Sequence, residues 1–242
     1  NEMDGPWQTG SWEKDPRGYG VLAHEVSKAM KWTDPTIETV VCASSSPLLN
    51  HYPQWDLDVL EPCYNTVDYV SLHHYHSAPL GNVKALLAGY KGFENYINTE
   101  ISLCDYMKTR LRSDKTMMLS FDEFGSMCRP EGKITLGMAG REPRKQFCEF
   151  NPEQKYVLHD PDDWSWRKRP RMGSEMVNTL ANLTTRLTLM RHADRVKIGC
   201  ATGGLGELCA TDREHVWRGA AWYPAEQLLK YGKGISLMPV VK

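Results

Sequence analysis

Short apolar runs alternate with longer amphipathic segments along this chain, and that alternation limits its possible folds most. The strand-like runs cover residues 39–43, 67–72, 116–121 and 195–200. Between them, apolar residues recur every three or four positions, as in a helix buried on one side. These stripes are Leu22, Val26, Ala29 and Met30; Ile97, Ile101, Cys104 and Leu111; and Met176, Leu180, Leu183, Leu187 and Met190, with a shorter helix at 225–231. Parallel strands need crossover helices, so the pattern predicts an α/β fold with a parallel sheet.

The number of strand–helix units indicates part of a (β/α)8 TIM barrel. A complete barrel usually takes about 250 residues, and this chain has 242. After an opening helix, however, only four strand–helix units can be read. The segment 126–173 is rich in proline and charge and has no clear period, so we expect one large loop there.

Composition excludes several functional classes. The chain has 29 Lys and Arg against 30 Asp and Glu, a net charge of -1, which argues against partners such as nucleic acid or a membrane surface. No apolar run approaches the roughly 18 residues that span a bilayer. The seven cysteines are scattered without a CxxC pair, which favours a reducing, cytoplasmic location. Because the chain starts at Asn1 rather than Met, we expect a segment of a longer protein.

Acidic residues stand at two places where strands end. Glu2 lies just ahead of the first helix, and Asp122 and Glu123 close the third strand. Catalytic residues of barrels gather at such ends, and glycoside hydrolysis requires a pair of carboxylates. Side chains alternate along a strand, which predicts that Asp122 and Glu123 point to opposite faces. Two unrelated surface acids would give the same spacing.

A histidine-rich segment closes the second strand. Alternation puts His73 and Tyr75 on one face and His74 and His76 on the other. Imidazole and phenol groups there can bind a carboxylate or a sugar hydroxyl. The alternative is a metal site at His74 or His76. It would need a further ligand that the sequence does not identify, and there is no HExxH motif, so we predict neither a metal nor a cofactor.

Two further motifs favour ordinary structural roles. The basic run 167–171 lies beside Trp164 and Trp166 and could contact an anionic polymer, but nearby aspartates favour a solvated loop. The glycine-rich segment 203–206 lacks the G-x-G-x-x-G spacing of a phosphate-binding loop.

Six segments, taken in order, resemble glycoside hydrolase family 51, the α-L-arabinofuranosidases. They are residues 1–8, 30–35, 67–73, 119–123, 189–198 and 223–234. The resemblance implies a barrel with an Asn-Glu pair after strand 4 and a glutamate after strand 7. Residues 1–242 would then run from the end of strand 4 through strand 8 and its helix. The N-terminal half-barrel and the β-sandwich domain of the family would be absent from this sequence.

The resemblance also implies roles for individual residues. Glu2 would be the acid/base, Glu123 the nucleophile and Asn1 the group that holds the sugar 2-hydroxyl, with His73 and Tyr75 as substrate-binding neighbours of the nucleophile. Retaining hydrolysis predicts carboxyl groups about 5 Å apart. It also predicts that burial and the charge of Glu123 raise the pKa of Glu2.

The implied function is release of terminal α-L-arabinofuranosyl residues from arabinose-containing oligosaccharides or polysaccharides, by a full-length protein that forms a homo-oligomer. Some positions depart from the family pattern. Gly203 and Gly206 stand where a glutamine and an asparagine are usual, and Phe124 and Met127 where tryptophans are usual. A β-glucan- or xylan-active glycosidase and a non-catalytic carbohydrate-binding homologue therefore remain alternatives.

Overall fold

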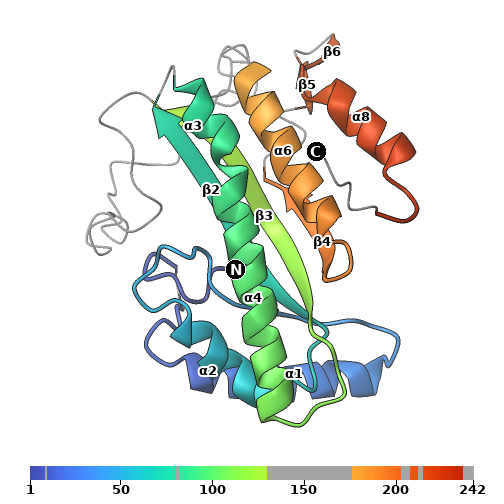
Figure 1. The fold of residues 1–242 in the computed structure, drawn as a ribbon. Coiled ribbons are helices and arrows are strands. Elements are labelled where there is room, and N and C mark those ends of the chain that lie inside the picture. The colour runs from blue at the N-terminus through green and yellow to red at the C-terminus, as the bar shows by residue number, and fades with distance from the viewer. Residues whose placement is uncertain (9, 80–81, 130–175, 203–207, 212–214, 237–242) are drawn as a thin grey trace, which may run out of the picture.

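The structure, a computed structural model, describes residues 1–8, 10–79, 82–129, 176–202, 208–211 and 215–236 (Figure 1). Its elements are α1 (Pro16–Thr33), β1 (Val40–Cys42), α2 (Gln54–Cys63), β2 (Tyr69–Pro79), α3 (Val83–Ala88), α4 (Tyr90–Arg110), β3 (Met118–Arg129), α6 (Met176–Arg191), β4 (Val196–Ala201), β5 (Cys209–Thr211), β6 (Val216–Arg218) and α8 (Trp222–Tyr231). No helix within these ranges is long and apolar enough to cross a membrane.

The predicted parallel sheet is present, with strand order β1-β2-β3-β4. Helices α3, α4 and α6 lie across one face of it in Figure 1. This confirms the α/β fold of consecutive strand–helix units. β2 and β3 run further than predicted, and β3 continues to Arg129, so the expected loop does not begin at Ser126. The remainder of that loop, the basic run 167–171 and the glycines of 203–206 lie outside the described residues.

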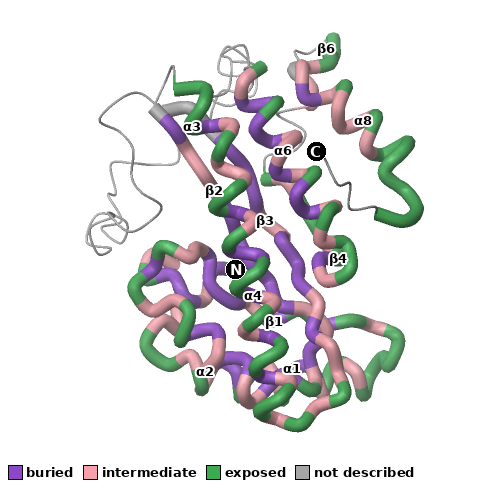
Figure 2. Tube along the Cα trace, viewed as in Figure 1, coloured by how far each residue is buried: buried purple, intermediate pink, exposed green. Residues whose placement is uncertain are grey.

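The core lies between the sheet and its covering helices, where Figure 2 shows buried stretches on both β2 and β3, interrupted by partly exposed ones. Trp55 of α2, Phe93 of α4 and Phe121 of β3 are almost completely buried. The rings of Phe93 and Phe121 meet edge to face with centroids 4.8 Å apart. Burying each such ring contributes about 1.5 to 3 kcal/mol, so this layer holds α4 against the strands.

The helices α1 and α6 form where predicted, but they bury a different side. On α1, Leu22, Val26 and Met30 are 45, 46 and 47% exposed, whereas Gly20 and Ser27 are buried. Gly20 lies so close to α2 that an added Cβ would stand 2.3 Å from a backbone oxygen. Within residues 1–242, α1 therefore packs on α2 through small residues, and its predicted apolar stripe is left nearly half exposed.

Helix α6 shows the same reversal. Leu180 and Leu187 are 43 and 41% exposed, while Asn178, Asn182 and Thr185 are buried. The buried polar groups find partners nearby: the Ser126 hydroxyl donates to Asn182 Oδ1 at 2.8 Å, and Thr185 donates to a carbonyl of its own helix. The apolar stripe of the sequence had predicted that the face with Leu180 and Leu187 would be buried.

A bulge in β3 overturns the predicted alternation of its acidic residues. Ser71 of β2 is opposite Ser120, but His73 is opposite Glu123, so two steps along β2 match three along β3. An extra residue of this kind lets neighbouring side chains share a face. Phe121 and Phe124 are accordingly both buried, and the adjacent Asp122 and Glu123 both approach His73.

Candidate active site

Glu2 is presented by a tight turn that precedes α1. The carbonyl of Glu2 accepts a hydrogen bond from the amide of Gly5 at 2.9 Å. The turn requires a backbone φ of 48° at Glu2, and a left-handed conformation of a non-glycine residue costs about 1 to 3 kcal/mol. The side chain is nonetheless only 6% exposed. Such strain at a buried carboxylate is typical of a functional position.

Asp4 anchors this turn to the segment that follows β1. Its carboxylate is completely buried and accepts hydrogen bonds from the amide and hydroxyl of Ser45 at 2.9 and 3.1 Å. His51 Nε2 lies 3.2 Å from the same oxygen. Two charge-assisted bonds to one oxygen thus hold the strained segment in place.

Three donors converge on the Glu2 carboxylate. Trp7 Nε1 and Gln8 Nε2 donate to Oε2, the latter at 2.9 Å, and His73 Nδ1 lies 3.2 Å from Oε1. Burial alone would raise the pKa of Glu2, but hydrogen bonds from His73, Trp7 and Gln8 outweigh burial and lower this pKa. The predicted raised pKa of Glu2 is therefore wrong, because donors to the ionised form were not visible in the sequence.

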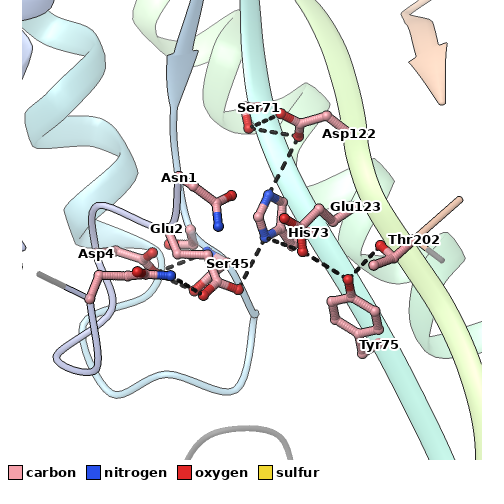
Figure 3. A network of polar contacts seen from close by, with 12 residues as sticks. Asn1, Glu2, Asp4, Ser45, Ser71, His73, Tyr75, Asp122, Glu123 and Thr202 are labelled. Carbon is pink, nitrogen blue, oxygen red and sulfur yellow. Dashed lines mark hydrogen bonds and ion pairs between the residues drawn. The ribbon is translucent and has the colours of Figure 1, made fainter. Parts of the chain in front are cut away.

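His73 stands at the centre of a group of carboxylates (Figure 3). Its Nδ1 is 3.2 Å from Glu2 and 3.6 Å from Glu123, and its Nε2 is 3.6 Å from Asp122. Burial lowers the pKa of His73, but the hydrogen bond to Glu2 and the charges of Glu123 and Asp122 raise it above its usual value. The geometry thus favours an imidazolium ring, hydrogen-bonded through Nδ1 to Glu2 and in ion-pair contact through Nε2 with Asp122.

Glu123 is oriented by Tyr75 from the neighbouring strand. The Tyr75 hydroxyl donates to Glu123 Oε2 at 2.8 Å and contacts the hydroxyl of Thr202, just beyond β4. Burial raises the pKa of Tyr75, and the hydrogen bond and charge of Glu123 add to that rise. The phenol therefore stays protonated and remains a donor to the carboxylate.

The two glutamates face each other across a short gap. One oxygen of Glu2, one oxygen of Glu123 and one nitrogen of His73 all lie within 4.8 Å of one another. This spacing agrees with the roughly 5 Å that retaining glycosidases use, and is shorter than the spacing in inverting enzymes. These three atoms are also close enough to surround a metal ion. Their contacts with one another account for the arrangement without one.

The other two histidines lie on the opposite face, as alternation predicted. His74 stacks on Phe93 with ring centroids 4.3 Å apart, and its ring is 5.5 Å from that of His76. Burial, followed by the proximity of His76, lowers the pKa of His74 to about 3. Within the described ranges neither ring joins a cluster of three metal-ligating side chains.

Comparisons with known proteins identify sequence relatives and structures of similar fold. No family model matches the chain. An intracellular exo-α-(1→5)-L-arabinofuranosidase from Acetivibrio thermocellus is 35% identical over 248 residues, which cover 100% of this chain and 44% of that protein. Its Bacillus subtilis counterpart is 33% identical, with the same shares covered. The chain is therefore homologous to part of these α-L-arabinofuranosidases.

Solved structures of this family share the fold. A family 51 enzyme from Bifidobacterium longum superposes with a TM-score of 0.73 at 24% identity, over 97% of this chain and 44% of that one. An arabinofuranosidase from Thermotoga maritima, solved as an arabinose complex, superposes with a TM-score of 0.66 at 17% identity. The superposition covers 96% of this chain and 39% of that one. The chain thus spans less than half the length of its relatives, and its sheet corresponds to part of their (β/α)8 barrel.

The structure therefore assembles most of the residues that the family resemblance singled out. Glu2, His73, Tyr75 and Glu123 form one connected group. Asn1 is exposed, and its amide lies beside Glu2 in Figure 3 without a drawn hydrogen bond.

Sequence reasoning assigned no role to several residues that shape the site. Trp7 and Gln8 were visible only within the family-like opening segment, where their spacing from Glu2 carries no signal. Asp4 lies in the same opening segment and had no role assigned, and Thr202 gave no sequence signal. The i, i+3 spacing of Phe121 and Phe124 was the one available sign of the bulge, since a regular strand buries every second residue.

Proposed function

We propose that the natural protein containing this chain is a retaining, exo-acting α-L-arabinofuranosidase. The observation that carries the proposal is the approach of a Glu2 oxygen and a Glu123 oxygen to within 4.8 Å. Two carboxyl groups at that distance leave room for a sugar carbon and for the oxygen that departs from it, but not for a water molecule placed for direct inversion.

In this proposal Glu123 is the nucleophile. Its carboxylate attacks the anomeric carbon while Glu2 protonates the leaving oxygen, which forms a covalent glycosyl ester and releases the alcohol. Water then attacks the anomeric carbon and loses a proton to Glu2, which regenerates Glu123 and frees arabinose. Tyr75 holds Glu123 in position, and Asn1 and His73 contact the sugar.

The lowered pKa of Glu2 and the raised pKa of His73 indicate that these two groups share one proton. In the resting state the proton is on His73, so the ring is charged and Glu2 is ionised. Transfer from Nδ1 to Oε1, across 3.2 Å, gives a neutral ring and a carboxylic acid that can protonate the leaving group. The proton taken from water in the second step restores the imidazolium.

The relatives suggest a substrate and a location. The proteins from Acetivibrio thermocellus and Bacillus subtilis are named for α-(1→5) linkages and as intracellular, and one from Bifidobacterium longum is named for α-(1→6) linkages. We therefore propose terminal α-(1→5)-linked arabinofuranosyl residues of oligosaccharides as the first substrates to test, in an intracellular homo-oligomer.

The exposed surfaces support the placement of residues 1–242 as the C-terminal half of a catalytic barrel. The apolar stripe of α1 is nearly half exposed, and within the described sheet β1 and β4 each pair on one edge only. In a closed barrel no strand edge stays open. An N-terminal half-barrel would pair with both edges and cover the α1 stripe, and a β-sandwich domain would complete the protein.

The test uses the natural full-length protein with p-nitrophenyl α-L-arabinofuranoside and with α-(1→5)-linked arabino-oligosaccharides. We expect hydrolysis from the non-reducing end, and proton NMR of the first product should show retained anomeric configuration. A mechanism-based inhibitor should label the peptide that contains Glu123. Inverted product would reject the mechanism, and absence of arabinose release would reject the activity.

A further inference from the structure

We propose that Asp122, anchored by Ser71, is a positioning residue that holds the His73 ring between the two glutamates and stabilises its imidazolium form. For its kinetic consequence this inference rests on the proposed function. Its structural basis is the bulge in β3, which turns a second carboxylate toward the same face as Glu123.

The position of Asp122 is specified by contacts on both sides of its carboxylate. The Ser71 hydroxyl donates to both oxygens at 2.7 and 2.8 Å, and Ser71 itself is only 4% exposed. On the other side, Asp122 Oδ1 lies 3.6 Å from His73 Nε2. In Figure 3 these groups form a line from Ser71 through Asp122 and His73 to the glutamates.

The bulge lets Asp122 and Glu123 share the face of His73. If the register of Ser71 and Ser120 continued without an extra residue, Asp122 would stand opposite His73 and Glu123 would turn toward the aromatic layer with Phe121. A carboxylate there would have neither water nor a cation beside it, which is costly. With the bulge both carboxylates face the ring, and Asp122 stands at the nitrogen that the glutamates do not reach.

The groups that face the His73 ring favour its doubly protonated form. His73 faces Glu2 from the opening turn, Asp122 and Glu123 from β3, and Tyr75 lies next on its own strand. A neutral imidazole has one N–H and one lone pair, so one of its nitrogens would always point a lone pair at a carboxylate. With carboxylates at both nitrogens, only the imidazolium satisfies every neighbour. Removing the charge at Nε2 lets the neutral ring form more readily.

The experiment measures the titration midpoint of His73 directly, by NMR of the natural full-length protein selectively labelled with ¹³C at the histidine ring. The His73 signal is assigned by its loss in His73→Gln. We compare the unaltered protein with Asp122→Asn, Asp122→Glu and Ser71→Ala. The matched control is Asp68→Asn, because Asp68 also carries hydrogen bonds next to β2, but at the opposite end of the strand and bonded to Thr39.

Asp122→Asn should lower the His73 midpoint by about one pH unit, since an opposite charge at this range shifts a pKa by one to three units. Ser71→Ala should lower the midpoint by less, and Asp122→Glu and Asp68→Asn should leave it close to the original. Equal midpoints in Asp122→Asn and Asp68→Asn would overturn the inference. If Asp122→Asn does not fold, an unchanged midpoint in Ser71→Ala would overturn it instead.

The pH profile of kcat/KM supplies the kinetic arm. In Asp122→Asn the fall of kcat/KM at alkaline pH should begin at a lower pH. This shift should equal the shift of the NMR midpoint of His73, and KM should stay nearly unchanged. A residue with a merely structural role would lower activity at every pH without moving the pH at which this fall begins. If the unaltered protein releases no arabinose, the proposed function fails, while the NMR titration still decides the role of Asp122.

Discussion

His73 and His74 are adjacent in sequence and lie on opposite faces of one strand, with opposite consequences. His74 packs on Phe93 in an apolar layer, and burial followed by nearby His76 lowers its pKa to about 3. His73 is almost equally buried, yet its carboxylate neighbours raise its pKa. Burial therefore does not decide the charge of a histidine here. The chemical nature of the groups across from each ring decides it.

The largest effect should come from removing the nucleophile on the His73 face. We expect Glu123→Ala to lower kcat of the full-length protein by about 10⁴-fold or more, as for other covalent nucleophiles. Steady-state kinetics on an aryl arabinofuranoside provide the measurement. The exposed Glu38, which accepts from Tyr69, supplies the control Glu38→Gln, which should stay near full activity. Comparable losses in both variants would disprove the assignment of Glu123.

Removing the acid/base should cost less and depend on the substrate. Glu2→Ala should lower kcat by about 10² to 10⁴-fold on oligosaccharides, the usual contribution of general acid–base catalysis. The loss of kcat/KM should be far smaller on a substrate with an activated leaving group, because that group departs without protonation. Azide should then restore turnover and yield a glycosyl azide of retained configuration. Equal losses on both substrates would contradict the role of Glu2.

Exchanging each histidine for phenylalanine compares the two faces directly. His73→Phe should lower kcat by about 10²-fold or more, because the shared proton and the contact with Glu2 are both lost. His74→Phe should keep activity within a few-fold, since the new ring can stack on Phe93 and needs no proton. The free energy of unfolding of His74→Phe should differ from that of the unaltered protein by less than about 1.5 kcal/mol, as for other substitutions of similar volume. Strong inactivation by His74→Phe would mean that the aromatic layer takes part in the chemistry.

The smallest effect should appear in how stability varies with pH. In the unfolded chain His74 regains a pKa near 6.5, while the folded value is about 3. Unfolding therefore takes up a proton below pH 6.5, and His74 lowers stability progressively as pH falls from 6.5 towards 3. His73 has a raised pKa, so its contribution is present below 6.5 and is lost as pH rises through the folded value.

Denaturant unfolding at a series of pH values measures these contributions. His74→Phe should flatten the acid side of the stability curve, and His73→Phe should flatten the side above pH 6.5. If His74→Phe leaves the acid slope as steep as in the unaltered protein, the neutral state assigned to buried His74 is wrong.

Much of the fold could be predicted because its determinants are local. The four strands, three long helices and the opposite faces of His73 and His74 follow from periods of two and 3.6 residues. The short helix α3 and α2, which contains Pro62, were missed because neither has a long apolar stripe. Within this chain α1 and α6 bury faces that hydropathy did not predict, because close packing and internal hydrogen bonds place small and polar residues there.

By itself the sequence determined a parallel α/β sheet with acidic and aromatic groups at the strand ends, and its likeness to family 51 singled out Glu2 and Glu123. Only the tertiary structure decided that Asp122 joins them, that hydrogen bonds lower the pKa of Glu2, and that the pKa of His73 is raised whereas that of His74 is lowered. The physical reason is distance. Strand and helix periods arise between neighbours in the chain, but the charge of a group depends on partners a few ångströms away, and Glu2 and His73 are 71 positions apart.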